Sequence, residues 1–508
     1  MTIRHRLHAA FVALSLLPLI VVAAMPGPLP RLSVSANHRF LQQADGSPFF
    51  WLGDTAWLLF SRLDRTGTRR YLDDRQAKGF TVIQVMVLHA ADARAANGAP
   101  ALVDNNPGNP RVTPGSDPLD PAAYDYWDQI DWVAAEAATR GLYLALVPAW
   151  GSVVTSGQLN AANVVAYGTF LARRYRDLPN VIWVVGGDAK GNEHIEVWKA
   201  LGRTLRAEDP HHLITFHPFG RMQSSTWFHG EPWLDFNMFQ SGHRRYDQDT
   251  DSPRRFGEDN WRYVLDDYAK EPAKPVLDGE PSYENIPQGL HDGTQPYWTA
   301  AAARRYAYWS VFAGACGHTY GDNAVMQFHT VTAGKGSYSP RNFWPEALDD
   351  AGAGQMRHLK ALMLSRPYFE RVYDAEAVVS GSGEKYDRLL ATKGRDYLFV
   401  YSYTGRPFSV RPGAIAGRSL RAWWFNPRDG RAQLIGVIGA SQIGRFSPPG
   451  ERGDGHDWVL VLDDASRGYP PPGGGGGARL SSGSGRTLLV IENNEMARLA
   501  APTLKIGR

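Results

Sequence analysis

The chain has 508 residues, of which 43% are hydrophobic and 21% are charged, a composition typical of soluble globular proteins and unlike that of disordered, collagen-like or multi-span membrane chains. Its length predicts two or more domains, because a domain usually holds about 100–200 residues. Lys plus Arg number 54 and Asp plus Glu 51, so the net charge is only +3 and nucleic acid is not an expected partner. Aromatic residues make up 12% of the chain, and such rings suit carbohydrate faces as well as protein cores.

The N-terminus carries a segment typical of a signal peptide. Arg4 and Arg6 precede an apolar run over 7–22, and small residues follow at 23–24, which indicates a leader over residues 1–24. An uncleaved membrane anchor is the alternative, although the run is shorter than the roughly 20 residues that cross a bilayer. We therefore expect a secreted or periplasmic protein, without stable membrane insertion once the leader is removed. The single cysteine, Cys316, excludes an intramolecular disulfide.

Short apolar runs alternate with segments of helical period between residues 49 and 320, a pattern typical of βα units with a parallel sheet. The runs expected to form strands are 49–54, 80–87, 142–147, 181–185, 212–216, 234–238, 275–278 and 314–320. Helices are expected after an N-cap at Asp120, and over 163–175, 194–207 and 297–312. Eight such strands predict an α/β fold, a (β/α)8 TIM barrel, over residues 32–367.

The pattern changes at the end of this region. Short alternating runs at 388–392, 396–402, 420–425, 432–436 and 457–462 predict an antiparallel sheet, with a hairpin turn at 426–430. A small antiparallel β-sandwich accessory domain over 368–466 fits this pattern. Residues 467–508, which include a Pro- and Gly-rich stretch at 470–477, are expected to be a low-complexity linker and tail.

Candidate catalytic residues are polar residues that end the apolar runs, because the carboxyl ends of barrel strands surround one pocket. Asp188 follows the fourth run and Glu280 follows the seventh. Two carboxylates on nearly opposite strands are what glycoside hydrolysis needs, one as acid and the other as nucleophile or base. The structural alternative for each is a helix cap or a salt bridge at the rim.

Further strand-end residues are candidates for binding substrate: Asp54, Trp57, His89, Trp150, Gln240, His243, Tyr283, His318 and Tyr320. Asp54 has a helix cap as its alternative role, and single histidines are more often structural. His217 ends the fifth run, and Asp278 is expected to support Glu280. The histidines lack the spacing of a zinc helix and the chain has no cysteine pair, so no metal or other cofactor is expected.

Three motifs stand in order at strand ends: Gly53-Asp-Thr-Ala-Trp57, Val185-Gly-Gly-Asp188 and Asp278-Gly-Glu-Pro281. With them, residues 32–465 resemble the apiosidase-like glycoside hydrolases, a (β/α)8 family whose members often carry a C-terminal β-sandwich of the collagen-binding type. The resemblance implies that Asp188 is the acid/base and Glu280 the nucleophile, with retention of configuration. It is also compatible with a furanose such as apiose, because the acid is Asp where related barrels have the longer Glu. We expect the C-terminal domain to brace the barrel rather than bind collagen.

These features predict an exported retaining glycoside hydrolase that removes a terminal sugar from a plant or cell-wall polysaccharide. Long loops at 90–121 and 241–260 favour action at chain ends. A non-catalytic carbohydrate-binding or scaffold protein with a degenerate barrel is the alternative, and the retained carboxylate pair argues against it. An esterase or protease is disfavoured because no nucleophile motif is found. The sequence does not define the sugar, the linkage or the oligomeric state.

Overall fold

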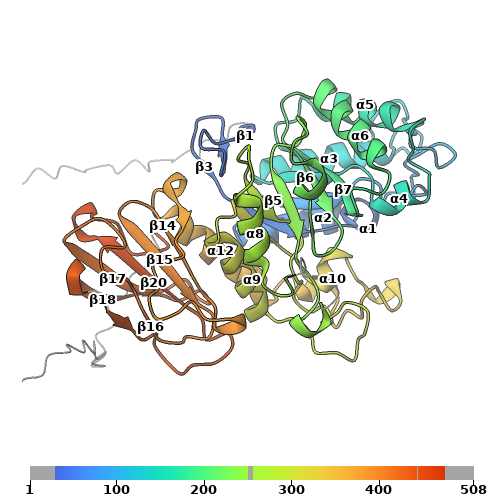
Figure 1. Cartoon of the computed structure of the whole chain (residues 1–508). Helices are drawn as coiled ribbons and strands as arrows, with labels where there is room; N and C mark the ends of the chain where they lie inside the picture. Colours follow the sequence, from blue (N-terminus) through green and yellow to red (C-terminus); the bar gives the residue numbers. More distant parts are fainter. Residues whose placement is uncertain (1–28, 250–255, 443, 475–508) are drawn as a thin grey trace, which may run out of the picture.

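The structure, a computed structural model, describes residues 29–249, 256–442 and 444–474. An α/β domain and an antiparallel β domain lie side by side, at the right and left of Figure 1. Within the described residues, no helix is both long enough and apolar enough to cross a membrane. The leader expected at 1–24 and most of the tail expected at 467–508 lie outside the described residues.

Eight parallel strands form the sheet of the α/β domain, and each overlaps a predicted run. They are β4 (Trp51–Thr55), β5 (Val82–Met86), β6 (Tyr143–Val147), β7 (Val181–Ala189), β8 (Ile214–Pro218), β10 (Asn237–Gln240), β11 (Val276–Asp278) and β12 (Gly317–Tyr320). Their order is β8-β7-β6-β5-β4-β12-β11-β10, and the short β9 (Met222–Gln223) pairs antiparallel with β10. The sheet closes where the Asp235 N–H donates to the Ile214 carbonyl at 2.9 Å. The predicted (β/α)8 fold class is confirmed.

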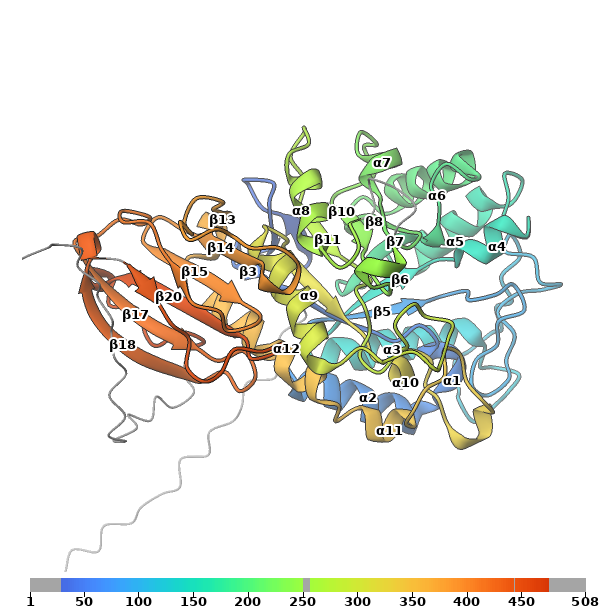
Figure 2. The ribbon, with the colours of Figure 1, turned by 60° about the horizontal axis from the view of Figure 1, so that its bottom comes forward.

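Helices surround this barrel, as Figure 2 shows. They are α1 (Leu59–Arg62), α2 (Arg65–Ala77), α3 (Tyr126–Thr139), α4 (Gly151–Thr155), α5 (Val164–Tyr175), α6 (Ile195–Glu208), α7 (Ser225–Phe228), α8 (Asn260–Tyr268), α9 (Ala300–Phe312), α10 (Asn323–Met326), α11 (Trp344–Ala347) and α12 (Ala351–Leu364). Short 3-10 helices lie at Tyr246–Gln248, Val331–Ala333, Tyr368–Glu370, Lys385–Asp387, Ala440–Gln442 and Ala465–Arg467.

The expected N-cap at Asp120 is wrong. Asp125 caps α3 instead, since its side chain accepts hydrogen bonds from the backbone N–H groups of Trp127 and Asp128. The Asp128 carboxylate in turn accepts the N–H of Asp125. This reciprocal capping box satisfies three N–H groups at once, so the helix begins there, and Asp120 only closes a local turn with Ala122.

The remaining strands form antiparallel sheets. A small N-terminal sheet contains β1 (Leu32–Val34), β2 (Leu41–Gln43) and β3 (Pro48–Phe49). The C-terminal domain has a six-stranded sheet in the order β13-β14-β15-β20-β17-β18 and a two-stranded sheet of β16 and β19. Their bounds are β13 (Val372–Tyr373), β14 (Leu389–Lys393), β15 (Tyr397–Ser402), β16 (Phe408–Ser409), β17 (Ser419–Phe425), β18 (Ala432–Gly439), β19 (Arg445–Phe446) and β20 (Trp458–Asp464).

The hairpin predicted at 426–430 joins β17 to β18, where the Gly430 N–H donates to the Asn426 carbonyl at 2.8 Å. One apolar cluster runs from the barrel onto one face of the C-terminal sheet, and it includes Phe399 and Val461. A second cluster, with Leu398 and Trp424, lies between the other face and the two-stranded sheet. The two domains therefore share a core, and Tyr308 of α9 stacks on Tyr401 with ring centroids 4.7 Å apart.

Candidate active site

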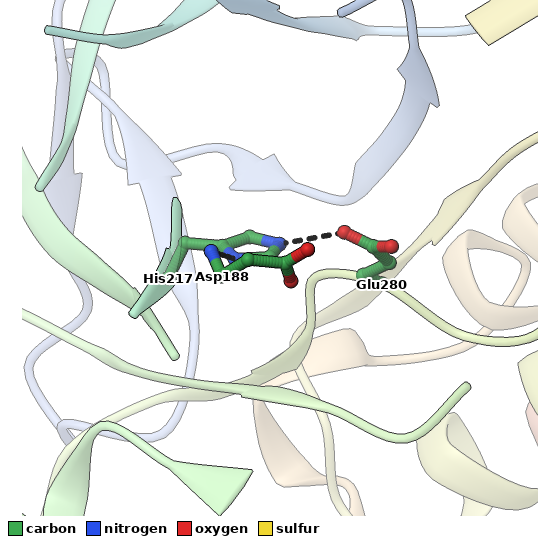
Figure 3. Close-up of side chains that lie close together, drawn as sticks. All are labelled: Asp188, His217 and Glu280. Carbon is green, nitrogen blue, oxygen red and sulfur yellow. Dashed lines mark hydrogen bonds and ion pairs between the residues drawn. The ribbon is translucent and has the colours of Figure 1, made fainter. Parts of the chain in front are cut away.

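Asp188 lies where β7 ends in an irregular turn. Gly186 and Gly187 have φ values of 96° and 107°, and the pairing with β8 is interrupted between Gly186 and Ala189. A Cβ atom on Gly187 would lie 2.4 Å from Cε3 of Trp150. Only glycine fits so tight a turn at this φ. The turn places the Asp188 carboxylate at the carboxyl ends of the barrel strands, next to His217 of β8 and to Glu280, which follows β11 (Figure 3).

Glu280 follows β11 by two residues and is buried, with 6% of its surface exposed. Two histidines contact its carboxylate from neighbouring strands. Nε2 of His217, at the end of β8, lies 3.1 Å from Oε2 of Glu280, and Nε2 of His243, beyond the end of β10, lies 3.0 Å from Oε1. Each oxygen of Glu280 therefore faces one imidazole.

His217 also connects the two carboxylate residues. Its Nδ1 accepts a hydrogen bond of 3.5 Å from the backbone N–H of Asp188. Because Nδ1 acts as acceptor, Nε2 carries the proton that faces Glu280. One carboxylate oxygen of Asp188, one of Glu280 and a ring nitrogen of His217 all lie within 4.8 Å of one another, as Figure 3 illustrates.

The two carboxyl groups have opposite ionisation behaviour. Burial, and after it the nearby charge on Glu280, raises the pKa of Asp188 from 3.8 to about 7. Burial also disfavours the charged form of Glu280, but hydrogen bonds from His217 and His243 outweigh it and lower the pKa to about 2. At pH values between these two, Asp188 is protonated and Glu280 is ionised. This is the division needed between a general acid and a nucleophile.

The same trio is the one grouping of His and acidic side chains in the described part of the chain that is close enough to hold a metal ion. An imidazole and two carboxylates form a ligand set that zinc accepts. The sequence lacks the residue spacing of a metal site and therefore did not predict this grouping, because the three residues come from three separate strands. The raised pKa of Asp188 works against metal binding below pH 7, since a ligating carboxylate must be deprotonated.

The structure brings most of the predicted aromatic residues to this pair. The ring centroids of Trp57 and Trp150 lie 5.0 Å apart, and they lie 5.5 and 5.8 Å from the centroid of His217. The Tyr283 ring meets the His243 ring edge-on at 4.7 Å, and the Gln240 side chain acts to lower the pKa of Asp188. Sugar contact by these residues stays a prediction, which their position favours.

Asp54, His318 and Tyr320 lie elsewhere. Asp54 is fully buried, where its Oδ2 lies 2.8 Å from Nε of Arg75 and accepts a bond of 2.6 Å from the Tyr71 hydroxyl; both partners belong to α2. His318 contacts Ser310 of α9 at 3.2 Å, and the Tyr320 hydroxyl donates to Glu284 at 2.6 Å.

These three side chains face the helix layer rather than the pocket, so the geometry favours structural roles over the predicted sugar contacts. It does not give Asp54 its alternative role as a helix cap either, because the first helix after β4 begins at Leu59. His89 lies at the rim, half-buried, with Nδ1 3.3 Å from the Ser61 hydroxyl, and its sugar contact stays a prediction.

Two residues near the pair had no role in the sequence-based prediction. His217 was recognisable as a strand-end residue, but its contact with Glu280 was not. Tyr338 lies in the loop between the 3-10 helix at Val331–Ala333 and α11; burial raises its pKa, and the charges of Asp188 and Glu280 raise it too. A cavity of about 130 Å³ adjoins Asp188 and is lined by Thr155, Ala189, Lys190, Glu193, Trp198 and Phe219.

A (β/α)8 barrel with an acid and an ionised carboxylate at its carboxyl-end mouth is the arrangement of a TIM-barrel glycoside hydrolase. The family model described as "Apiosidase-like, catalytic domain" matches residues 35–370. The chain therefore belongs to the apiosidase-like family of glycoside hydrolases. The model described as "Putative collagen-binding domain of a collagenase" matches residues 372–463. The non-catalytic alternative is set aside.

Solved structures agree with this assignment. One, named "Glycoside hydrolase", is 45% identical, with a TM-score of 0.81, and the match covers 86% of this chain and 97% of that one. A glycoside hydrolase family 5 protein from Bacteroides vulgatus is 44% identical, with a TM-score of 0.82, over 87% of this chain and 95% of that one. No curated protein matches the chain.

Proposed function

We propose that the protein is an exported, retaining glycoside hydrolase that releases a terminal furanosyl sugar of the apiose type from a plant or cell-wall polysaccharide. The observation that carries the retaining mechanism is the distance between the carboxylates, one oxygen of each lying within 4.8 Å of the other. Retaining enzymes hold their two carboxyl groups about 5–5.5 Å apart, whereas inverting enzymes separate them by about 6.5–9.5 Å to admit a water molecule.

In the first step, an ionised oxygen of Glu280 attacks the anomeric carbon while Asp188 gives its proton to the departing glycosidic oxygen. The bond between sugar and leaving group breaks as the bond from sugar to Glu280 forms. In the second step, Asp188 takes a proton from water, whose oxygen attacks the anomeric carbon and frees Glu280. His217 and His243 keep Glu280 ionised for the attack, and burial keeps Asp188 protonated.

The cavity beside Asp188 supports a place for the leaving group, since the acid must donate to the oxygen that departs with it. Phe219, 38% exposed, offers an apolar face there. The sugar itself would lie between Glu280 and the pair of indoles, Trp57 and Trp150. A short Asp as acid supports a compact furanose ring, which brings the glycosidic oxygen close to β7.

The test is a screen of pectic and arabinose-containing polysaccharides for released monosaccharide, followed by kinetics on aryl furanosides with Glu280→Ala. We expect the variant to lose at least about 10⁴-fold in kcat, because no group then attacks the anomeric carbon. Sodium azide should restore turnover by giving the glycosyl azide of inverted configuration. ¹H NMR of the first product of the wild type should show retained configuration.

Glu284→Gln is the matched control. Glu284 is also a buried carboxylate, four residues further on, but it accepts bonds from the Tyr320 hydroxyl and the Gly352 N–H at 2.6 and 2.9 Å. This variant should keep its kcat. Full activity of Glu280→Ala would exclude Glu280 as nucleophile, and an inverted first product would exclude the two-step mechanism.

Export is tested separately. The basic and apolar residues at 1–24 lie outside the described residues, and their sequence supports a cleaved leader. N-terminal sequencing of protein recovered from the periplasm or medium of a bacterial host should show a start after residue 24. Recovery of the intact N-terminus with the membrane fraction would instead favour an anchor.

A further inference from the structure

A short segment of the C-terminal domain, residues 385–388, lies against the barrel, where it contacts residues between β10 and the first turn of α8. The Tyr386 hydroxyl donates to the Glu258 carboxylate, 3.0 Å from each oxygen. Nζ of Lys385 lies 5.5 Å from the centroid of the Tyr246 ring. The guanidinium carbon of Arg388 lies 4.1 Å from the ring centroid of Trp261 in α8. All three contacts fall on the loop that follows β10 or on the first turn of α8.

Glu258 is the centre of this contact. Its side chain is 1% exposed, and it forms an ion pair with Arg305 of α9, which is equally buried. It also accepts a hydrogen bond of 3.3 Å from the backbone N–H of Tyr246. A buried carboxylate costs several kcal/mol unless hydrogen bonds and an opposite charge compensate it. Tyr386 supplies the hydroxyl donor, and its ring covers the Arg305 guanidinium at 4.5 Å.

The described parts of this loop, 241–249 and 256–259, support the proposed nucleophile at both ends of the loop. At the first end, His243 contacts Glu280 at 3.0 Å, and the His243 carbonyl accepts bonds from the Gly289 N–H at 2.8 Å and from Nε1 of Trp298 at 3.0 Å. At the second end, the Asn260 side chain donates to Asp278 of β11 at 3.0 Å. Tyr246, which contacts both Glu258 and Lys385, is three residues from His243.

We propose that the C-terminal domain is part of the active site, and that Tyr386, through Glu258 and Tyr246, is a positioning residue that holds His243 against Glu280. The domain is therefore needed for catalysis and not only for bracing. The proposal rests on the proposed role of Glu280 as nucleophile. It assigns no contact between Tyr386 and the sugar.

Tyr386→Phe tests this, because it removes only the hydroxyl and keeps the ring on Arg305. A matched control exists at the same interface. The Tyr401 hydroxyl donates at 3.1 Å to Asp457, which pairs at 2.9 Å with Arg304, the residue before Arg305 on α9. Asp457 belongs to the C-terminal domain, so Tyr401→Phe removes the same kind of bond without touching the loop that carries His243.

We expect Tyr386→Phe to lower kcat about tenfold with KM changed less than twofold, the pattern of an interaction that acts on the reacting state.

Glu280 is faced by charged or titratable groups on several elements: His217, His243, Asp188, Tyr283 and Tyr338. Of these, only His243 lies on the loop that Tyr386 holds. Weakening its contact raises the pKa of Glu280, so the acid limb of kcat/KM should move to higher pH. Tyr401→Phe should keep both kcat and the pH profile of the wild type.

A double-mutant cycle locates the effect. In a His243→Ala background, Tyr386→Phe should cause no further loss of kcat if it acts through His243. Equal kcat losses in Tyr386→Phe and Tyr401→Phe, or an unshifted pH profile in Tyr386→Phe, would overturn the proposal.

A readout without turnover separates this proposal from the proposed function. NMR of histidine-labelled protein, with the His243 signal assigned from His243→Ala, should show a shifted His243 ring in Tyr386→Phe and an unshifted one in Tyr401→Phe. If the wild type hydrolyses no glycoside, the proposed function fails while this comparison still decides the coupling. An unshifted His243 signal in Tyr386→Phe would exclude it.

Discussion

At the scale of single residues, the proposed acid Asp188 is kept protonated because it lies where its charge is unfavourable. Its pKa of about 7 in the folded protein lies above its ordinary value of 3.8. Below pH 3.8 the group is protonated in both the folded and unfolded states and has no effect on the free energy of unfolding. Between pH 3.8 and 7 only the folded state binds the proton, so stability falls as pH rises, and the loss is complete above pH 7.

We therefore predict that Asp188→Asn is more stable than the wild type at pH 8, while being nearly inactive. The difference in Tm should be smallest near pH 4, should grow up to about pH 7 and then stay constant, because Asn does not titrate. Thermal unfolding of both proteins across this pH range measures it. Asp278→Asn is a parallel case: burial also raises the pKa of Asp278 to about 7, so its Tm difference from the wild type should follow the same pH trend, at lower Tm values because the bonds from Ser241 and Asn260 are weakened. A Tm difference that does not change with pH would show that the charge of Asp188 is not destabilising.

The sequence selected both carboxylates because each lies within a few residues of the end of an apolar run, where parallel strands direct side chains to a common pocket. The same rule also selected Asp54, His318 and Tyr320. The prediction failed for all three for the same reason, because they lie on the same face of the sheet. Asp54 pairs in register with Tyr320 on adjacent strands, and His318 lies two residues before Tyr320. All three face the helices, since side chains alternate along a strand. The sequence does not reveal which alternate set faces inward where both sets contain polar residues.

At the scale of elements, the strands were predictable and the turns that carry function were not. The strand runs are apolar and continuous because both faces of a barrel strand are covered. The end of β7 depends on three consecutive residues with positive φ, from Gly186 to Asp188, and on the indole that packs against them. Likewise, the position of Tyr338 depends on a hydrogen bond of 2.8 Å from the Asn323 side chain to its carbonyl, in a loop without any periodic pattern.

We predict that Gly187→Ala lowers kcat/KM at least about 100-fold, because the added methyl must displace Trp150 or shift the Asp188 backbone, and errors of about 1 Å cost this much. The backbone at φ 107° adds strain of about 1–2 kcal/mol. Steady-state kinetics and Tm should both be measured. Gly141→Ala is the matched control, since Gly141 has φ 74° with no atom within 4 Å of an added Cβ. It should lose stability but keep kcat/KM. Equal activity of both alanine variants would contradict the role assigned to this turn.

At the scale of the whole molecule, the two domains behave as one packing unit. The apolar cluster of the barrel continues onto the C-terminal sheet through Tyr397 and Phe425. Arg366, after α12, forms a buried ion pair with Asp463 of β20 at 2.7 Å. Separating the domains would expose this apolar surface and leave buried charges unpaired, each of which is unfavourable. Multi-domain chains often unfold in steps, but a shared core of this kind makes the unfolding of the two domains cooperative.

We predict that destabilising the far side of the C-terminal domain inactivates the barrel as well. Leu398 is fully buried in the second cluster, which excludes the barrel. Leu398→Ala should cost about 2–5 kcal/mol by leaving a cavity. Because we expect the domains to unfold together, the wild type and Leu398→Ala should each show a single calorimetric transition. In the variant, the temperature at which glycosidase activity is lost should fall by as much as the calorimetric Tm. Leu434→Ala, at an exposed position of β18 in the same domain, should change neither. The contradicting outcome is two calorimetric transitions, with activity lost only at the transition whose temperature Leu398→Ala leaves unchanged. That result would show that the barrel is stable without its partner domain.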